Sequence, residues 1–289
     1  MEKLWTRPRY IKCGSPIRVT APIPNPILYT DYSDPDAIRV GEDYFMIASS
    51  FCNTPAVPLL HSKDLVNWKV INYIIDKLPF DYYDKPVHGC GTWAPAIRYH
   101  EGTYYVFIPM PDEGIMMCKT TDPFGKWSEP AYVRKVVGWI DPCPFWDEDG
   151  KAYMVTAFAR SRIGFKSMLY MSPIEPDCSG VLGDGQFIYD GHVTQPTIEG
   201  PKLYKRNGYY YIFCSGRRRK ARLADGTSFE KYLRSLGGKD CSASGQFSRQ
   251  RTSPGCLGGY PGRTGLVPAF PGCGQCRTYR SFAAYALGE

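Results

Sequence analysis

The sequence has no uninterrupted apolar run of the roughly 18 residues that a membrane-spanning helix requires. Its opening residues, MEKLWTRPRYIKCG, also lack the apolar segment of a secretory signal peptide. These two absences argue against a membrane-anchored or exported protein. We therefore expect a soluble, cytoplasmic protein with no membrane partner.

A disulfide framework is also missing. The 11 cysteines are odd in number and scattered along the chain, so reduced thiols are expected. Cys273 and Cys276 form a C-x-x-C pair, which can be half of a zinc site or a redox pair. No second pair stands at a matching distance, so we interpret these cysteines as accidental and expect no metal site from them.

Excess charge is absent from most of the chain, although the formal net charge is +7. Residues 216–289 hold 13 Lys and Arg against 4 Asp and Glu, whereas residues 1–215 hold 22 against 24. A basic tail on a neutral body is one pattern of a nucleic-acid-binding arm. This tail is not a clean basic run with interleaved aromatics, and it has no periodic signal. We expect no nucleic-acid partner and keep binding through the tail as a weaker alternative.

Aromatic residues and turn formers, in contrast, are abundant. Phe, Trp and Tyr make up 15% of the chain, which also has 29 Gly and 25 Pro, a mixture that favours an all-β protein. A polar glycine turn followed by an aromatic strand recurs in residues 39–51, 98–110, 145–158 and 203–215. A period of about 50 residues with about four strands per unit is typical of a β-propeller. A β-sandwich is the weaker alternative, because it requires no such recurrence.

A carboxylate precedes the aromatic hairpin in three of these units. Asp34, Asp141 and Glu199 each stand where the innermost strand of a blade would begin, at one mouth of the central channel. Each residue alone is typical of a turn or a helix cap. Because the pattern recurs once per unit, we expect the three carboxylates to converge on one site, where an acid–base pair suits glycoside hydrolysis.

The same segments resemble glycoside hydrolase family 43. The matching motifs stand in the family's order over about residues 25–214: SDPDAIRVGEDYFM, LLHSKDLVNW, GTWAPAIRYHEGTYYVF, IDPCPFWDEDGKAYM and EGPKLYKRNGYYYIF. The resemblance implies a five-bladed β-propeller that cleaves terminal xylose or arabinofuranose from xylan- or arabinoxylan-derived oligosaccharides. It implies no cofactor. A bound calcium ion occurs in some relatives, but the sequence has no recognisable calcium loop.

The resemblance also implies roles for individual residues. Asp34 resembles the general base, Glu199 the general acid, and Asp141 the carboxylate that orients the acid and raises its pKa. Trp93 and Phe51 resemble walls of the sugar pocket, and both are also compatible with ordinary core positions. The family's inverting mechanism needs roughly 6.5–9.5 Å between acid and base, which leaves room for a water molecule.

Three questions stay open at this level. Xylose and arabinofuranose are both substrates in this family, and the sequence does not choose between them. A non-catalytic carbohydrate-binding propeller is an alternative to an enzyme, although the full set of three carboxylates argues against it. The sequence sets no oligomeric state.

The last quarter of the chain does not continue the repeat. We interpret residues 1–214 as four blades of an incomplete propeller domain and residues 215–289 as an out-of-frame tail in place of blade five. With one base dropped near the codon for Ser215, the degenerate codons allow segments that resemble the family's fifth blade, among them GPHQG and GRIVH. A propeller that cannot pair its last blade with its first exposes strand edges, so we expect this polypeptide to be poorly soluble or weakly active.

We predict that the gene and its transcript hold one extra nucleotide within the codons for Cys214 to Arg219. Resequencing this stretch, together with translation of the downstream DNA in the shifted frame, tests the interpretation. The shifted frame is expected to encode the fifth-blade segments. A shifted frame that encodes neither GPHQG nor GRIVH would show that the tail is an in-frame part of the protein.

Overall fold

The structure is a computed structural model that describes residues 26–193, 195–206, 209–215, 225–228, 269–271 and 280–282. Most of the predicted tail, residues 215–289, lies outside these ranges, as do the basic run at 217–220 and the C-x-x-C pair. No helix among the described residues is long and apolar enough to cross a membrane.

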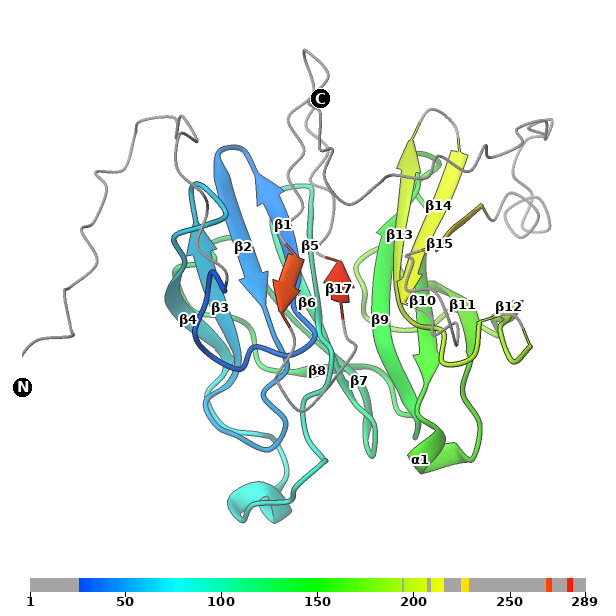
Figure 1. Cartoon of the computed structure of the whole chain (residues 1–289), viewed down its shortest axis with the longest axis horizontal. Helices are drawn as coiled ribbons and strands as arrows, with labels where there is room; N and C mark the ends of the chain where they lie inside the picture. Colours follow the sequence, from blue (N-terminus) through cyan, green and yellow to red (C-terminus); the bar gives the residue numbers. More distant parts are fainter. Residues whose placement is uncertain are drawn as a thin grey trace, which may run out of the picture.

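Three antiparallel sheets in the described residues each contain four strands in chain order (Figure 1). We number these sheets as blades one to three. Blade one contains β1 (Asp36–Val40), β2 (Asp43–Ile47), β3 (Ala56–Ser62) and β4 (Lys69–Ile75). Blade two contains β5 (Ala96–His100), β6 (Thr103–Met110), β7 (Gly114–Thr120) and β8 (Ala131–Arg134). Blade three contains β9 (Trp139–Trp146), β10 (Ala152–Phe158), β11 (Met168–Ile174) and β12 (Gln186–Asp190).

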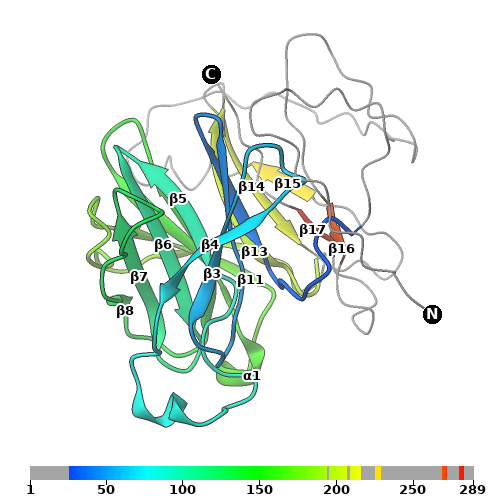
Figure 2. The same ribbon diagram turned by 90° about the vertical axis from the view of Figure 1, so that its left-hand side faces the viewer.

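The fourth sheet, blade four, has three described strands, β13 (Glu199–Arg206), β14 (Tyr209–Ser215) and β15 (Asp225–Ser228). Two short strands, β16 (Ala269–Pro271) and β17 (Arg280–Phe282), pair only with each other. The helices among the described residues are the 3₁₀ turn η1 (Asp81–Asp84) and α1 (Arg160–Ile163), which lie at the same end of the molecule in Figures 1 and 2.

The first strands of the four sheets lie next to one another in order. β5 contacts both β1 and β9, and β9 in turn contacts β13. Each sheet therefore packs face to face on the next around a common centre, which is the arrangement of propeller blades. This confirms the all-β, propeller-type fold predicted from the repeat.

Hairpin turns at the predicted glycines open the first three blades. Gly41, Gly102 and Gly150 have φ values of +61°, +79° and +80°, in the left-handed region that glycine adopts without steric cost. Each turn joins the innermost strand of a blade to its second strand. The fourth predicted turn glycine, Gly208, lies outside the described residues.

Alternating residues of blade two fill the space on its two faces. Tyr104, Val106 and Ile108 pack in a cluster with buried side chains of blade one, whereas Tyr105 and Phe107 pack in a cluster with blade three. Successive side chains of a strand point to opposite faces, so a fully apolar strand can serve two neighbours. A further buried cluster joins blades three and four.

A buried carboxylate links the innermost strands. Asp36 of β1 is 1% exposed, and its Oδ2 accepts hydrogen bonds from the Ile97 N–H (3.0 Å) and from Arg98 Nη1 (2.7 Å). Lys202 of β13 lies 3.3 Å from the same oxygen. Burial alone would raise the pKa of Asp36, but the two cations outweigh it and lower that pKa below its ordinary value. Asp36 is therefore held as an anion between two blades.

The Arg98 guanidinium extends this network to blade three. Its Nη2 lies 3.0 Å from the Sγ of Cys143 in β9, and the Leu203 N–H of β13 donates to the same sulfur at 3.2 Å. Side chains or backbone from β1, β5, β9 and β13 thus meet at the centre. Because each partner comes from a different sheet, the network fixes how the blades are oriented.

We predict that Arg98→Leu lowers the free energy of unfolding by about 3 kcal/mol, since it leaves the buried Asp36 charge with less compensation. The loss is expected near the lower end of the range for broken buried pairs, because Lys202 remains. Arg39→Leu is the matched control, since Arg39 is exposed in the corresponding strand of blade one. Urea unfolding followed by fluorescence measures both. Equal losses in the two variants would contradict a special role for Arg98.

Candidate active site

The entrances of three blades share an unusual backbone conformation. Asp34, Asp141 and Gly200 have φ values of +49°, +53° and +64°, and each precedes a proline. Left-handed conformations are uncommon for residues other than glycine and cluster at functional sites. Two of these three positions carry predicted catalytic carboxylates.

In blades three and four this conformation belongs to a β-bulge. Asp141 and Pro142 together oppose one residue of β10, because the pairing shifts between Val155 and Ala157. In blade four the corresponding shift, between Glu199 and Lys202, leaves Gly200 and Pro201 as the extra pair. Bulges re-aim side chains at strand ends. Here they redirect the chain near the start of the innermost strands of blades three and four.

The carboxylate of blade four stands one residue earlier than those of the other blades. Gly200, not an acid, occupies the left-handed position, and Glu199 precedes it. The Gly200 N–H donates to Oδ2 of Asp141 at 2.7 Å. The two bulges are therefore in direct contact, and this contact brings Glu199 next to Asp141.

Asp34 lies at the exposed side of the site. Its Oδ2 accepts hydrogen bonds from the hydroxyls of Ser33 (3.3 Å) and Ser49 (3.2 Å). The Ser49 N–H also donates to the Ser33 carbonyl at 3.0 Å, which ties the Asp34 turn to the end of β2. Asp34 is therefore an exposed carboxylate that two hydroxyl donors hold in place.

Asp141 lies at the buried side, with 8% of its surface exposed. Burial raises the pKa of Asp141 to about 7, and the negative charges of Glu199 and Asp34 add to this effect, while the Gly200 N–H opposes it. All three predicted carboxylates are therefore close enough to interact. Like charges in one site resist joint ionisation, so Asp141 keeps its proton up to near neutral pH.

The two predicted aromatic residues lie near each other at this mouth. Phe51 and Thr92 form an isolated antiparallel bridge, with N–H···O distances of 2.9 and 3.0 Å. Gly91 allows this close approach, because a Cβ there would lie 2.2 Å from the Phe51 carbonyl oxygen. Trp93 follows directly, and 37% of the Phe51 surface remains exposed.

Trp93 is half-buried and packs against the apolar cluster between blades three and four. That cluster includes Ile140 and Ile198, the chain neighbours of Asp141 and Glu199. Trp93 is therefore at the carboxylates' end of the channel, as a pocket wall would be. Phe51 is exposed and lies outside the buried core, whereas Trp93 is partly buried and packs against it.

A separate hollow of about 400 Å³ lies at the opposite ends of the innermost strands. Its lining includes Arg39, His100, Trp146, Glu148 and Lys205. Glu148 is the one carboxylate among the lining residues, so the lining of this hollow offers no pair of carboxylates. Within the described ranges, no group of three His, Cys, Asp or Glu side chains is placed to hold a metal ion.

The sequence motifs did not reveal two features near the site. Ser49 donates to Asp34 from a strand end 15 residues away. Arg162, in the connection between β10 and β11, forms an ion pair with Asp112 and lies over Trp93. Asp36 was already visible in the motif SDPD, but its burial was not. Only the alternation of inward and outward side chains along β1 could have indicated it.

Comparison with known proteins places this geometry in a family. The model of glycosyl hydrolases family 43 matches residues 23–248. A putative β-xylosidase of Xylanibacter ruminicola is 40% identical over 62% of this chain and 33% of its own length. A xylosidase/arabinosidase of Butyrivibrio fibrisolvens is 34% identical over 71% of this chain and 39% of its own length.

A solved structure agrees with these matches. The crystal structure of xylan β-1,4-xylosidase from Bacillus halodurans C-125 superposes with a TM-score of 0.60 at 29% identity, over 68% of this chain and 39% of that one. The chain thus spans little more than a third of the length of the relatives that it matches. The protein is a member of glycosyl hydrolases family 43.

Proposed function

We propose that this protein is a glycoside hydrolase that removes terminal xylose or arabinofuranose from xylan-derived oligosaccharides by an inverting acid–base mechanism. The supporting observation is the convergence of three carboxylates from three blades, in which Glu199 and Asp34 help to raise the pKa of Asp141 to about 7. Membership of the family supports the reaction class.

The proposed roles follow from differences in exposure. Asp34, the exposed carboxylate, takes a proton from the attacking water, and the hydroxyls of Ser33 and Ser49 hold it in place. Glu199, on the opposite side of the sugar, gives its proton to the leaving glycosidic oxygen. One C–O bond forms to water as the other breaks, so the anomeric configuration inverts.

Asp141 is proposed to keep a proton available to Glu199. The negative charge of Glu199 helps to raise the pKa of the buried Asp141 to about 7, so Asp141 can hold a proton beside Glu199 below that pH. The Gly200 N–H bonded to Asp141 ties the backbone next to Glu199 to that carboxylate. The buried position of Asp141 suits a tuning role better than direct contact with water.

The sugar class is inferred from the relatives. Their names pair β-xylosidase with arabinosidase, and one relative from Bacteroides ovatus is named a non-reducing end α-L-arabinofuranosidase. Both sugars are pentoses, and we propose that Trp93 and Phe51 form walls of the site that binds them. A non-catalytic carbohydrate-binding role is less well supported, because binding alone requires no cluster of three carboxylates.

We predict that Glu199→Gln lowers kcat on xylobiose by about 10²–10⁴-fold, the range for loss of general acid catalysis. The loss is expected to be much smaller on a nitrophenyl β-xyloside, because nitrophenolate leaves without protonation. Steady-state kinetics on the two substrates measure the difference. If the parent hydrolyses arabinofuranosides instead, the same comparison applies to those substrates.

Glu129→Gln is the matched control for this variant, since Glu129 is a highly exposed carboxylate next to β8. It should leave both rates unchanged. Equal losses on the two substrates in Glu199→Gln, or a parental rate on xylobiose, would contradict the assignment of Glu199 as the acid.

We also predict that Asp141→Asn stabilises the fold above pH 7 while it lowers activity. A carboxyl whose folded pKa is raised favours folding below its unfolded pKa, near 3.8, and loses that contribution as pH rises toward 7. Asparagine removes this penalty and can still accept the Gly200 N–H. Melting temperatures at pH 5 and pH 8 test this. A variant less stable than the parent at pH 8 would refute it.

A further inference from the structure

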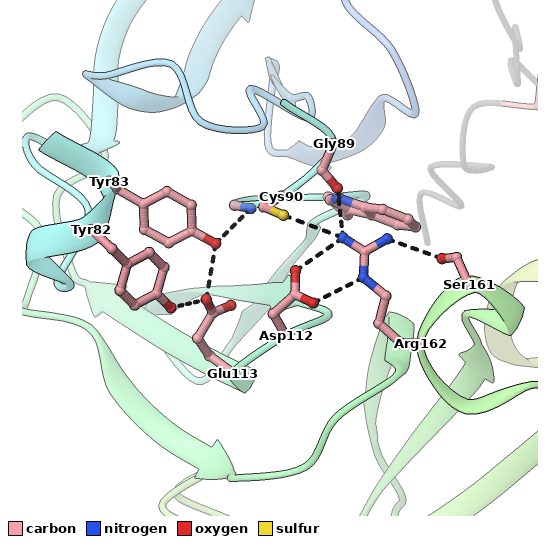
Figure 3. A network of polar contacts seen from close by, with 10 residues as sticks. Tyr82, Tyr83, Gly89, Cys90, Asp112, Glu113, Ser161 and Arg162 are labelled. Atoms are coloured by element: carbon pink, nitrogen blue, oxygen red, sulfur yellow. Dashed lines mark hydrogen bonds and ion pairs between the residues drawn. The ribbon is translucent and has the colours of Figure 1, made fainter. Parts of the chain in front are cut away.

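One side chain of α1 reaches out of blade three toward blade two. Arg162 Nε and Nη2 donate to the two carboxylate oxygens of Asp112 at 2.9 and 3.0 Å (Figure 3). Asp112 lies in the turn between β6 and β7. A two-point contact between guanidinium and carboxylate fixes the plane of the guanidinium as well as its position.

The same guanidinium also lies over the indole of Trp93. Its Cζ is 5.1 Å from the centre of that ring, within the range of a cation–π interaction. Arg162 Nη2 donates to the Gly89 carbonyl at 2.8 Å, and Trp93 Nε1 donates to the same oxygen at 3.2 Å. The guanidinium and the indole are therefore held together by one shared acceptor.

These contacts join three connections that are distant in the sequence. Gly89 belongs to the loop between blades one and two, Asp112 to a hairpin of blade two, and Arg162 to a connection within blade three (Figure 3). The Ala159 N–H donates to the Gly138 carbonyl at 2.8 Å, which places the start of α1 beside the start of β9 and three residues before Asp141. The three-way contact is thus at the carboxylates' end of the channel.

Arg162 is far more enclosed than an ordinary surface arginine. Its side chain is 17% exposed, although it is on a four-residue helix whose other arginine, Arg160, is exposed. Enclosure strengthens both the ion pair and the cation–π contact, because less water competes for the charge. The indole that it covers is half-buried, packs on the apolar cluster between blades three and four, and has the guanidinium over its ring.

We propose that Arg162 is a positioning residue that holds Trp93 as a wall of the sugar pocket, an inference that rests on the proposed glycosidase function. Because Arg162 acts through an aromatic wall, it supports the ground state and the transition state alike. Its loss should therefore raise KM and leave kcat nearly unchanged. A purely structural role predicts lower thermal stability with an unchanged KM.

The test is steady-state kinetics on xylobiose with the full chain and its Arg162→Met variant. We expect KM to rise about tenfold while kcat stays within about twofold. Arg160→Met, from the same helix, is the matched control and should keep the parental KM. If Arg162→Met does not fold, Arg162→Lys replaces it, with an expected rise of at least about threefold. A parental KM in the variant that folds overturns the proposal.

A double-mutant cycle shows whether Arg162 acts through Trp93. In a Trp93→Ala background, Arg162→Met should change KM by less than about twofold, because the ring that it positions is gone. Independent, additive effects would show that Arg162 acts elsewhere and would overturn the proposal.

The outcome also separates this inference from the proposed function. A parent that cleaves xylobiose, with a parental KM in Arg162→Met, refutes the inference alone. If the parent has no activity, the xylose-induced rise in its melting temperature reports binding, and its loss in Arg162→Met supports the inference. A parent that neither cleaves nor binds pentose sugars refutes both.

Discussion

The buried charge of Asp36 is the constraint on which the arrangement of the innermost strands depends. A carboxylate that is 1% exposed is tolerated only with compensating partners, and these come from β5 and β13. Arg98 satisfies Asp36 and at the same time contacts Cys143 in β9. The network thus holds β1, β5, β9 and β13 in a fixed mutual orientation, a few residues after the site carboxylates. The geometry of the site depends on this network, whose side chains lie further along the same strands.

The second constraint is the left-handed residue before proline at three blade entrances. It turns the chain sharply at the channel mouth, and Asp tolerates it better than most residues. In blade four, glycine takes the strained position, and the longer glutamate side chain stands one residue earlier. The same left-handed turn before proline therefore places three carboxylates at the blade entrances, and their exposures to solvent differ. Asp34 is exposed to water, whereas Asp141 is buried.

The sequence was sufficient to predict the features that repeat. Glycine turns at a period of about 50 residues predicted the blades, and the position of Asp34, Asp141 and Glu199 before each hairpin predicted their convergence. The bulge at Asp141 could not be predicted, because the register of pairing depends on a partner strand. The contact between Arg162 and Trp93 could not be predicted either, since it joins connections with no periodic pattern. The interpretation of residues 215–289 as an out-of-frame tail stays a prediction.

The position of Cys143 has a consequence for following how the propeller opens. Its sulfur is fully buried where strands of three blades meet, and it accepts hydrogen bonds from two of them. A thiol-specific reagent can reach it only when those blades separate, so its labelling rate measures the free energy of that separation. Cys52 and Cys90, which are partly exposed, label without such opening. Labelling of Cys143 therefore reports the separation of blades two, three and four from one another. Labelling of a surface cysteine reports only the exposure of its own loop.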